Sequence, residues 1–260
     1  MAALSYDNLE TLTNFAHRAG IGFPLLADPE IRIIESFGIV NTQVPRDHEL
    51  YGFAYAGYYL IDAQGKVRAK FFNQRNNDRF TSANILIRQF DAQAGSPQGE
   101  AETKHLRLRW SASNPIGRPG QRLALVLDID LKEGMHVYAP EVEGYIPIDW
   151  QMEAPDGAEV HKPQYPSSER MHLSAIDETV PVYQGSFKLL RDIRIEGGRR
   201  FPPALQGKER LVFEGLFKYQ ACDDVKCYLP VSIPLKWEIR LEGHDLNRVP
   251  EEIRRRTPQP

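Results

Sequence analysis

A chain of 260 residues is long enough for one large domain or two ordinary ones, and two domains is the better expectation. Hydrophobic residues make up 42% of the chain and charged residues 26%, which is ordinary for a globular protein. The formal net charge of -3 argues against a general attraction to nucleic acid, so we expect no nucleic-acid partner.

The sequence predicts no membrane span and shows no export signal. Its longest uncharged apolar stretch, residues 51–61, is about half of the roughly 20 residues that a spanning helix needs. The N-terminus lacks a basic segment followed by an apolar one, the pattern of a secretory signal. Two explanations stay open: a cytoplasmic protein, or a sequence that starts downstream of the native N-terminus.

Residues 1–92 alternate short apolar runs with helical patterns, which is typical of an α/β domain. Asp7 with Glu10 fits a capping box for a helix that Gly20 ends, and Asp28 is expected to cap a second helix. Three strands and a last amphipathic helix are expected at 23–26, 58–62, 66–72 and 79–90.

The pattern changes after residues 93–104, which carry Gly, Pro, Ser and charge and are predicted to be a linker. Residues 105–245 are rich in β-type sequence with Gly and Pro turns between the runs. Strands are expected at 106–110, 122–130, 187–195, 209–219 and 231–241. This domain is predicted to be an all-β, immunoglobulin-like sandwich, and residues 246–260 to be a polar, frayed tail.

Both cysteines of the chain lie in one segment, YQACDDVKCYLP (219–230), between two predicted strands. Cys222 and Cys227 should therefore face each other at the mouth of a β-hairpin, close enough for a disulfide. A structural staple would gain only about 2 kcal/mol from so short a loop, against about 4.7 kcal/mol for a loop of roughly 100 residues. Tight disulfides near the surface exchange readily, which favours a redox pair over a staple without excluding the staple.

A metal site is the third alternative for the cysteine pair. It would need four ligands, and the histidines that could be recruited show no paired spacing: His105, His136, His161 and His172. The neighbouring charges leave the reactivity open, because Lys226 favours a thiolate whereas Asp223 and Asp224 disfavour one. The two aspartates also suit a turn.

The cysteine segment resembles the active-site segment of the N-terminal periplasmic domain of the thiol:disulfide interchange protein DsbD. In that family a Tyr-Gln, a cysteine pair and a Cys-Tyr-x-Pro follow one another. KEGMHVYAP (132–140) and VPVYQGSFKLLRDIRI (180–195) resemble other stretches of the same domain, so the resemblance covers about 106–241. It implies an immunoglobulin-like fold that passes electrons between a membrane reductase and extracytoplasmic thiol proteins. This chain has four residues between its cysteines, where the best-known family member has five.

Carried over by position, Cys222 and Cys227 would exchange disulfides with thioredoxin-like or DsbD-type partners, as a protein-disulfide oxidoreductase. No cofactor or metal would be needed beyond the redox-active disulfide. A cap loop would lie within residues 164–179. The pocket and cap candidates are Tyr138, His136, Tyr165, Met171 and Tyr228. Ordinary packing at the edge of a sandwich is the alternative role for Tyr138 and His136.

The first domain resembles the peroxiredoxin-like (AhpC/TSA, redoxin) branch of the thioredoxin fold. The resemblance rests on ALSYDNLETLTNFAHRAGIGFPLLADPEIRIIESFGI (3–39) and GYYLIDAQGKVRAKFF (57–72). No cysteine precedes Cys222, so the first β-α unit of that fold is expected to be missing. The family's Pro-Gly-Thr reads Ala56, Gly57 and Tyr58, without the proline.

Three functions are therefore to be separated. Thiol-disulfide exchange in the periplasm or cell envelope is favoured. A non-catalytic binding module, with a structural disulfide and a degenerate redoxin scaffold, is the alternative. Peroxiredoxin-type activity through Cys222 is the least favoured, because nothing nearby in the sequence resembles a peroxide-binding Thr/Arg pocket.

Overall fold

The computed structural model describes residues 1–48, 50–72, 79–90, 92, 94–173, 177–198, 201–247 and 249–253. The chain divides into two compact units. One is formed by Met1–Asn76 together with Asp245–Pro260, and the other is Asn77–His244. No helix within the described ranges has the length and apolar character needed to cross a membrane.

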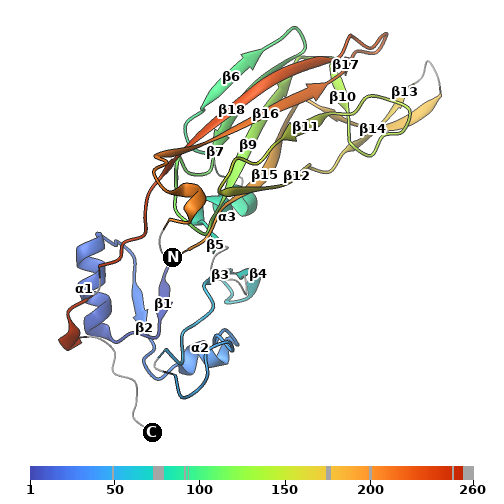
Figure 1. The fold of residues 1–260 in the computed structure, drawn as a ribbon. Helices are drawn as coiled ribbons and strands as arrows, with labels where there is room; N and C mark the ends of the chain where they lie inside the picture. The colour runs from blue at the N-terminus through green and yellow to red at the C-terminus, as the bar shows by residue number, and fades with distance from the viewer. Residues whose placement is uncertain are drawn as a thin grey trace. The chain divides into compact units, whose positions relative to one another are not determined.

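The first unit contains short helices and strands (Figure 1). They are β1 (Ala3–Ser5), α1 (Leu9–Ala19), β2 (Leu25–Ala27), α2 (Arg32–Ser36), β3 (Gly57–Ile61), β4 (Val67–Phe72) and the 3-10 helix η2 (Glu251–Ile253). β1 precedes α1 in the chain and β2 follows it, and the two strands pair in parallel. β3 and β4 form an antiparallel hairpin. This α/β content agrees with the sequence prediction for residues 1–72.

The caps of α1 differ from the prediction at one end. Asn8, not Asp7, is the N-cap, and its side chain accepts a hydrogen bond of 2.8 Å from the Thr11 N–H. The Asp7 carboxylate instead accepts from the Ser5 hydroxyl at 2.6 Å. At the other end the prediction is confirmed, because Gly20 ends the helix with a φ of 62°.

The second predicted helix begins later than expected. α2 starts at Arg32, after Ile31 in a left-handed conformation with a φ of 56°. Asp28 therefore does not occupy the N-cap position. It still stabilises the helix, because its buried carboxylate accepts the Ile34 N–H at 2.9 Å.

The described part of the C-terminal segment is attached to this unit rather than frayed. The Ile253 carbonyl accepts hydrogen bonds from the Thr11 hydroxyl at 2.5 Å and the Asn8 side-chain amide at 3.3 Å. Arg18 pairs with Asp245 at 3.1 Å. The prediction of a free polar tail is wrong for residues 249–253, and residues 254–260 lie outside the described ranges.

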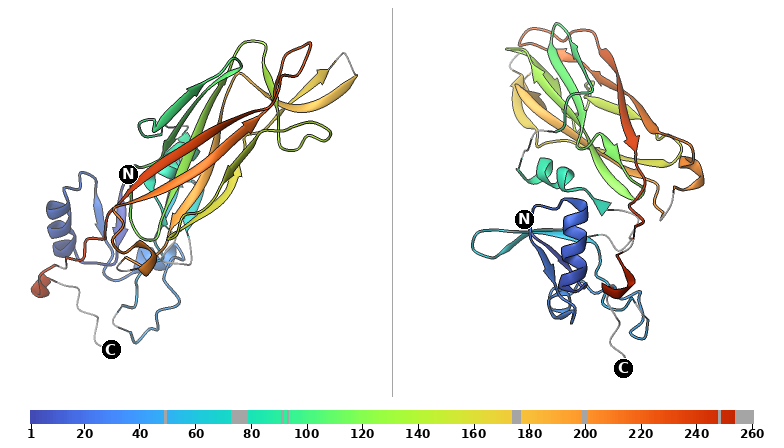
Figure 2. Two further views of the ribbon diagram at one scale, coloured as in Figure 1. Left: turned by 45° about the horizontal axis from the view of Figure 1, so that its top comes forward. Right: turned by 90° about the vertical axis from the view of Figure 1, so that its left-hand side faces the viewer.

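The second unit is built almost entirely of strands, which form two large sheets and one small one (Figures 1 and 2). Its elements are β5 (Arg79–Phe80), α3 (Ser82–Phe90), β6 (Gly99–Glu102), β7 (Leu106–Ala112), β8 (Ile116–Gly117), β9 (Gln121–Leu131), β10 (His136–Tyr138), β11 (Asp149–Met152), β12 (Ala158–Gln164), β13 (Glu169–Leu173), β14 (Glu178–Gln184), β15 (Ser186–Ile195), η1 (Pro203–Leu205), β16 (Arg210–Tyr219), β17 (Ala221–Cys222) and β18 (Val231–Leu241). The five strands predicted here are confirmed to within two residues as β7, β9, β15, β16 and β18.

The two large sheets enclose the main core. Their strand orders are β12-β15-β9-β7-β6, with β5 added on β9, and β11-β16-β18-β8. Trp237 of β18 stacks on Trp150 of β11 inside the core, with ring centroids 5.6 Å apart. The Trp237 indole N–H donates to the Ser111 carbonyl of β7 at 2.9 Å and so ties the two sheets together. The predicted sandwich is thus a mostly β unit with one main core between its two large sheets.

Helix α3 packs on this sandwich, although its sequence was assigned to the first domain. The Asn84 side-chain amide donates to the buried Asp192 carboxylate of β15 at 2.9 Å, and Arg88 pairs with the same carboxylate at 2.6 Å. Ile85 and Ile87 of the helix itself are buried. An amphipathic pattern shows that a helix has an apolar face, but not which sheet covers it.

The predicted linker is also partly ordered. β6 lies within residues 93–104 and pairs with β7 from Gly99 opposite Trp110 to Glu102 opposite Arg107. Gly99 permits this approach, because a Cβ there would lie 2.1 Å from the Trp110 ring. The polar, glycine-rich composition therefore reflects an edge strand rather than a free linker.

Candidate functional site

The small third sheet carries the cysteine pair. Its strand order is β13-β14-β10-β17, and it lies at the end of the sandwich away from α3 (Figures 1 and 2). β17 follows β16 directly, so the core strand positions Cys222. Cys222 and Cys227 face each other across a short antiparallel hairpin and form a disulfide, with Cα atoms 4.0 Å apart. The predicted hairpin and pairing are confirmed.

Asp223 shapes the turn between the two cysteines. One of its carboxylate oxygens accepts the backbone N–H groups of Val225 and Lys226, each at 2.8 Å, and the other accepts the Tyr228 hydroxyl at 2.7 Å. These bonds, led by the one from Tyr228, lower the pKa of Asp223 to about 2. The carboxylate is thus a turn former, as its position in the sequence allowed.

The two cysteines differ sharply in solvent exposure. Cys222 is 1% exposed, whereas Cys227 is exposed to solvent. Two large apolar side chains beside Cys227 also face solvent, Val225 at 91% and Leu229 at 85% exposure. A second protein that approaches the disulfide would therefore meet Cys227 first, on a partly apolar surface.

Two neighbouring tyrosines lie next to the pair, the buried Tyr138 and the half-buried Tyr145. The Tyr138 hydroxyl lies 3.6 Å from the Cys227 Sγ, and its ring stacks on Tyr145 with centroids 4.5 Å apart. Burial raises the pKa of Tyr138, with a smaller contribution from Glu178. Tyr145 donates to the Glu178 carboxylate at 2.5 Å, which raises the pKa of this second tyrosine to about 12.

Four of the five pocket and cap candidates lie near the disulfide. Tyr138 and Cys222 form a small apolar cluster, against which Met171 packs. His136 lies opposite Cys222 in the sheet, and Tyr228 belongs to the hairpin itself. Tyr165 is the exception, because it packs against the main core, so the structure does not support its role as a lid.

The segment expected to form a cap loop is largely a hairpin. β13 and β14 pair from Glu169 opposite Val182 to Leu173 opposite Glu178, which places Met171 opposite Val180. Residues 174–176 lie outside the described ranges. Sequence reasoning missed Tyr145 and Glu178, since neither belongs to a motif and only the folded chain brings them beside Tyr138.

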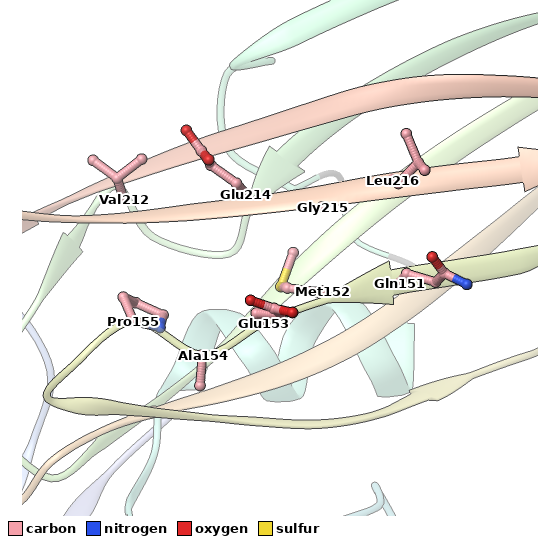
Figure 3. A pocket seen from close by; sticks show the side chains of 9 residues that line it. All are labelled: Gln151, Met152, Glu153, Ala154, Pro155, Val212, Glu214, Gly215 and Leu216. Carbon is pink, nitrogen blue, oxygen red and sulfur yellow. The ribbon is translucent and has the colours of Figure 1, made fainter.

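A hollow elsewhere on the sandwich contains none of these residues. It is a surface groove of about 520 Å³ between β11 and β16, lined by Met152, Glu153, Pro155, Val212, Glu214 and their neighbours (Figure 3). It holds no cysteine or histidine. Across the residues that the structure describes, no group of three or more His, Cys, Asp or Glu side chains is arranged to hold a metal ion.

Comparison with known families decides the relationship of the cysteine segment. A sequence model described as "Thiol:disulfide interchange protein DsbD, N-terminal" matches residues 103–233, which is half of the chain. The chain belongs to this family. The match spans the DsbD-like cysteine hairpin and the strands around it. A model of the AhpC/TSA family matches residues 1–70, so the first unit is similar to that family.

The solved structures that the chain matches include two bacterial domains. The N-terminal periplasmic domain of ScsB from Proteus mirabilis is 13% identical, with a TM-score of 0.39, over 55% of this chain and 52% of that one. The DsbD N-terminal domain of Neisseria meningitidis, in the reduced form, is 16% identical, with a TM-score of 0.31, over 45% and 78%. The chain thus spans about half of the ScsB domain.

A third similar structure comes from a eukaryote. The GAE domain of GGA2p from Saccharomyces cerevisiae is 7% identical, with a TM-score of 0.31, over 54% of this chain and 96% of that one. No curated protein matches the sequence.

Proposed function

We propose that the chain is a thiol-disulfide exchange module that passes electrons through the Cys222–Cys227 pair. The observation that carries the proposal is the disulfide itself, which closes a short hairpin in a DsbD-family segment with one cysteine exposed and the other buried. The disulfide would be the only redox group involved, without a cofactor.

The difference in exposure suggests an order of events. In the reduced protein, the exposed Cys227 attacks a disulfide of the partner and forms a mixed disulfide, releasing one partner thiolate. The buried Cys222 then attacks the Sγ of Cys227, which closes the intramolecular disulfide and releases the second partner thiolate. Two electrons pass from this chain to the partner, and the reverse sequence reduces this chain.

The partners that fit this chemistry are thioredoxin-like or DsbD-type redox proteins, one on each side of the transfer. Membership of the DsbD family supports this choice, and it also supports a location in the periplasm or cell envelope. For the first unit we propose a partial thioredoxin-like fold, supported by its similarity to the AhpC/TSA family at residues 1–70. That unit has no cysteine, so we assign it no thiol chemistry.

The test combines a reduction potential with a transfer assay. The purified chain would be equilibrated with glutathione buffers, and its reduced form mixed with an oxidised thioredoxin-like protein. We expect a potential above about -300 mV and transfer that the Cys227→Ser variant abolishes. A potential below that value, with no transfer, would identify a structural disulfide. If Cys222→Ser/Cys227→Ser protein then still bound its partner, the non-catalytic binding module would be favoured.

A further inference from the structure

His136 occupies a position from which it can act on Cys222. The two residues are directly opposite in the antiparallel pairing of β10 with β17. Such residues point to the same face of a sheet, with Cβ atoms about 4.5–5.5 Å apart. Tyr138, two residues further along β10, points to this face too, because its hydroxyl contacts the Cys227 Sγ. The imidazole therefore lies on the same face of the sheet as the side chain of the directly opposed Cys222.

The environment of His136 is unusual for a histidine in a core. The residue is 1% exposed, and among the residues that the structure describes neither ring nitrogen has a hydrogen-bond partner while the disulfide is closed. Buried polar side chains are normally hydrogen-bonded, so this one requires an explanation. A ring that packed only for structural reasons would be better replaced by an apolar one, because an unsatisfied buried polar group is destabilising.

The groups that surround the imidazole leave it neutral in the oxidised protein. Burial lowers the pKa of His136, and the carboxylates of Asp224 and Asp223 oppose this shift more weakly. On its own strand the next ring on this face is Tyr138, at a centroid distance of 5.7 Å. On the other side β14 places the uncharged Gln184 opposite. A neutral imidazole has a free lone pair, so it can accept a proton.

We propose that His136 is the general base that takes the thiol proton of Cys222 when the reduced pair closes. The inference rests on the proposed exchange function. In this step the Cys222 S–H bond breaks and its proton moves to a ring nitrogen of His136. The thiolate attacks the Sγ of Cys227 in the mixed disulfide, the S–S bond to the partner breaks, and the partner sulfur leaves with the electron pair. In the reverse direction the imidazolium returns the proton to Cys222.

Burial of Cys222 explains why a base is needed. A thiol becomes a nucleophile only as a thiolate, and an apolar environment disfavours the charged form. Water and buffer bases have little access to a side chain that is 1% exposed. A base fixed beside the sulfur removes this difficulty, and such proton transfers typically accelerate a reaction by about 10²- to 10⁴-fold.

A two-phase reaction with dithiobis-nitrobenzoate tests the role of His136 in the full chain. The reduced protein should release one coloured thiolate when Cys227 is modified, and a second when Cys222 displaces the reagent. We expect His136→Gln to slow the second phase at pH 7 by at least about tenfold and to leave the first within about twofold. The matched control is His172→Gln, which removes a half-exposed histidine from β13 of the same sheet and should change neither phase.

The pH dependence of the wild-type protein provides a second measurement, which is independent of whether the variant folds. The rate of the second phase should rise with pH, with an apparent pKa below the value of about 8.5 for an ordinary thiol. In His136→Gln this apparent pKa should increase to about 8.5 or above. The role of His136 would be overturned if the variant left the rate of the second phase unchanged or slowed both phases equally. It would also be overturned if the second-phase rate of the wild-type protein followed the pKa of an ordinary thiol. Absence of a second phase in the wild-type protein would instead contradict the exchange function itself.

Discussion

Reduction of the Cys222–Cys227 disulfide is expected to lower the free energy of unfolding of the second unit by only about 2 kcal/mol. The bond joins residues five apart in the sequence, so it closes a loop of about six residues and restricts the unfolded chain little. The main core does not contain either cysteine, because Cys222 belongs to the separate cluster around Tyr138. The sandwich should therefore stay folded when the pair is reduced.

The same estimate can be expressed as a reduction potential. For a two-electron couple, 30 mV corresponds to about 1.4 kcal/mol, so 2 kcal/mol lowers the potential of the folded pair by roughly 45 mV relative to the same pair in the unfolded chain. Folding thus makes the disulfide only slightly harder to reduce. A disulfide that the folded protein stabilised by several kcal/mol would be harder for a partner to reduce.

Urea unfolding of the oxidised and reduced proteins measures this difference directly. All three tryptophans, Trp110, Trp150 and Trp237, lie in the second unit, so their fluorescence reports on the unit that holds the disulfide. The midpoints should differ by about 0.7–2 M if the slope is near the typical 1–3 kcal/mol/M of small domains. Loss of the cooperative transition on reduction, or a difference above about 4 kcal/mol, would show that the bond is a structural staple.

Two further predictions concern the surroundings of the pair and the attachment of α3. Tyr228→Phe removes the largest cause of the low pKa of Asp223, so the pKa should rise from about 2 towards its usual value near 4, as an NMR titration of the carboxyl carbon would show. In the wild-type protein, stabilisation by ionised Asp223 should be fully present above about pH 4 and lost as the pH falls through about 2; a midpoint near 4 would contradict the hydrogen bonds. Arg88→Ala leaves the buried Asp192 carboxylate with less compensation and should cost about 3 kcal/mol in the same urea assay, whereas a loss below 1 kcal/mol would show that the ion pair contributes little.

The sequence predicted the parts of the fold that depend on long regular patterns. β16 and β18 each run for ten residues or more with clear alternation, and both were found within a residue. The cysteine hairpin followed from them, because two neighbouring strands with a short connection must turn back between their ends. The disulfide could thus be predicted from the residues, and its family from the flanking Tyr-Gln and Tyr-x-Pro.

The short strands escaped prediction for a physical reason. β10 has three residues and β17 has two, which is too few for any periodicity to appear, yet they place His136 opposite Cys222. The location of α3 escaped for another reason, since the partner of Asn84 and Arg88 is Asp192, about a hundred residues further along the chain. Contacts of that kind depend on tertiary packing and leave no local signal.

The position of α3 has a practical consequence for work on isolated fragments. A fragment cut within residues 93–104, where composition suggests a boundary, would lose β5 and α3, including the buried Ile85 and Ile87, and would expose the Asp192 carboxylate of the sheet. A cut after residue 102 would also remove β6 from its partner strand β7, and a cut shortly before residue 99 would leave β6 at the N-terminus of the fragment. A soluble sandwich for crystallisation or for screening redox partners should therefore begin at residue 77 or earlier and end near residue 244.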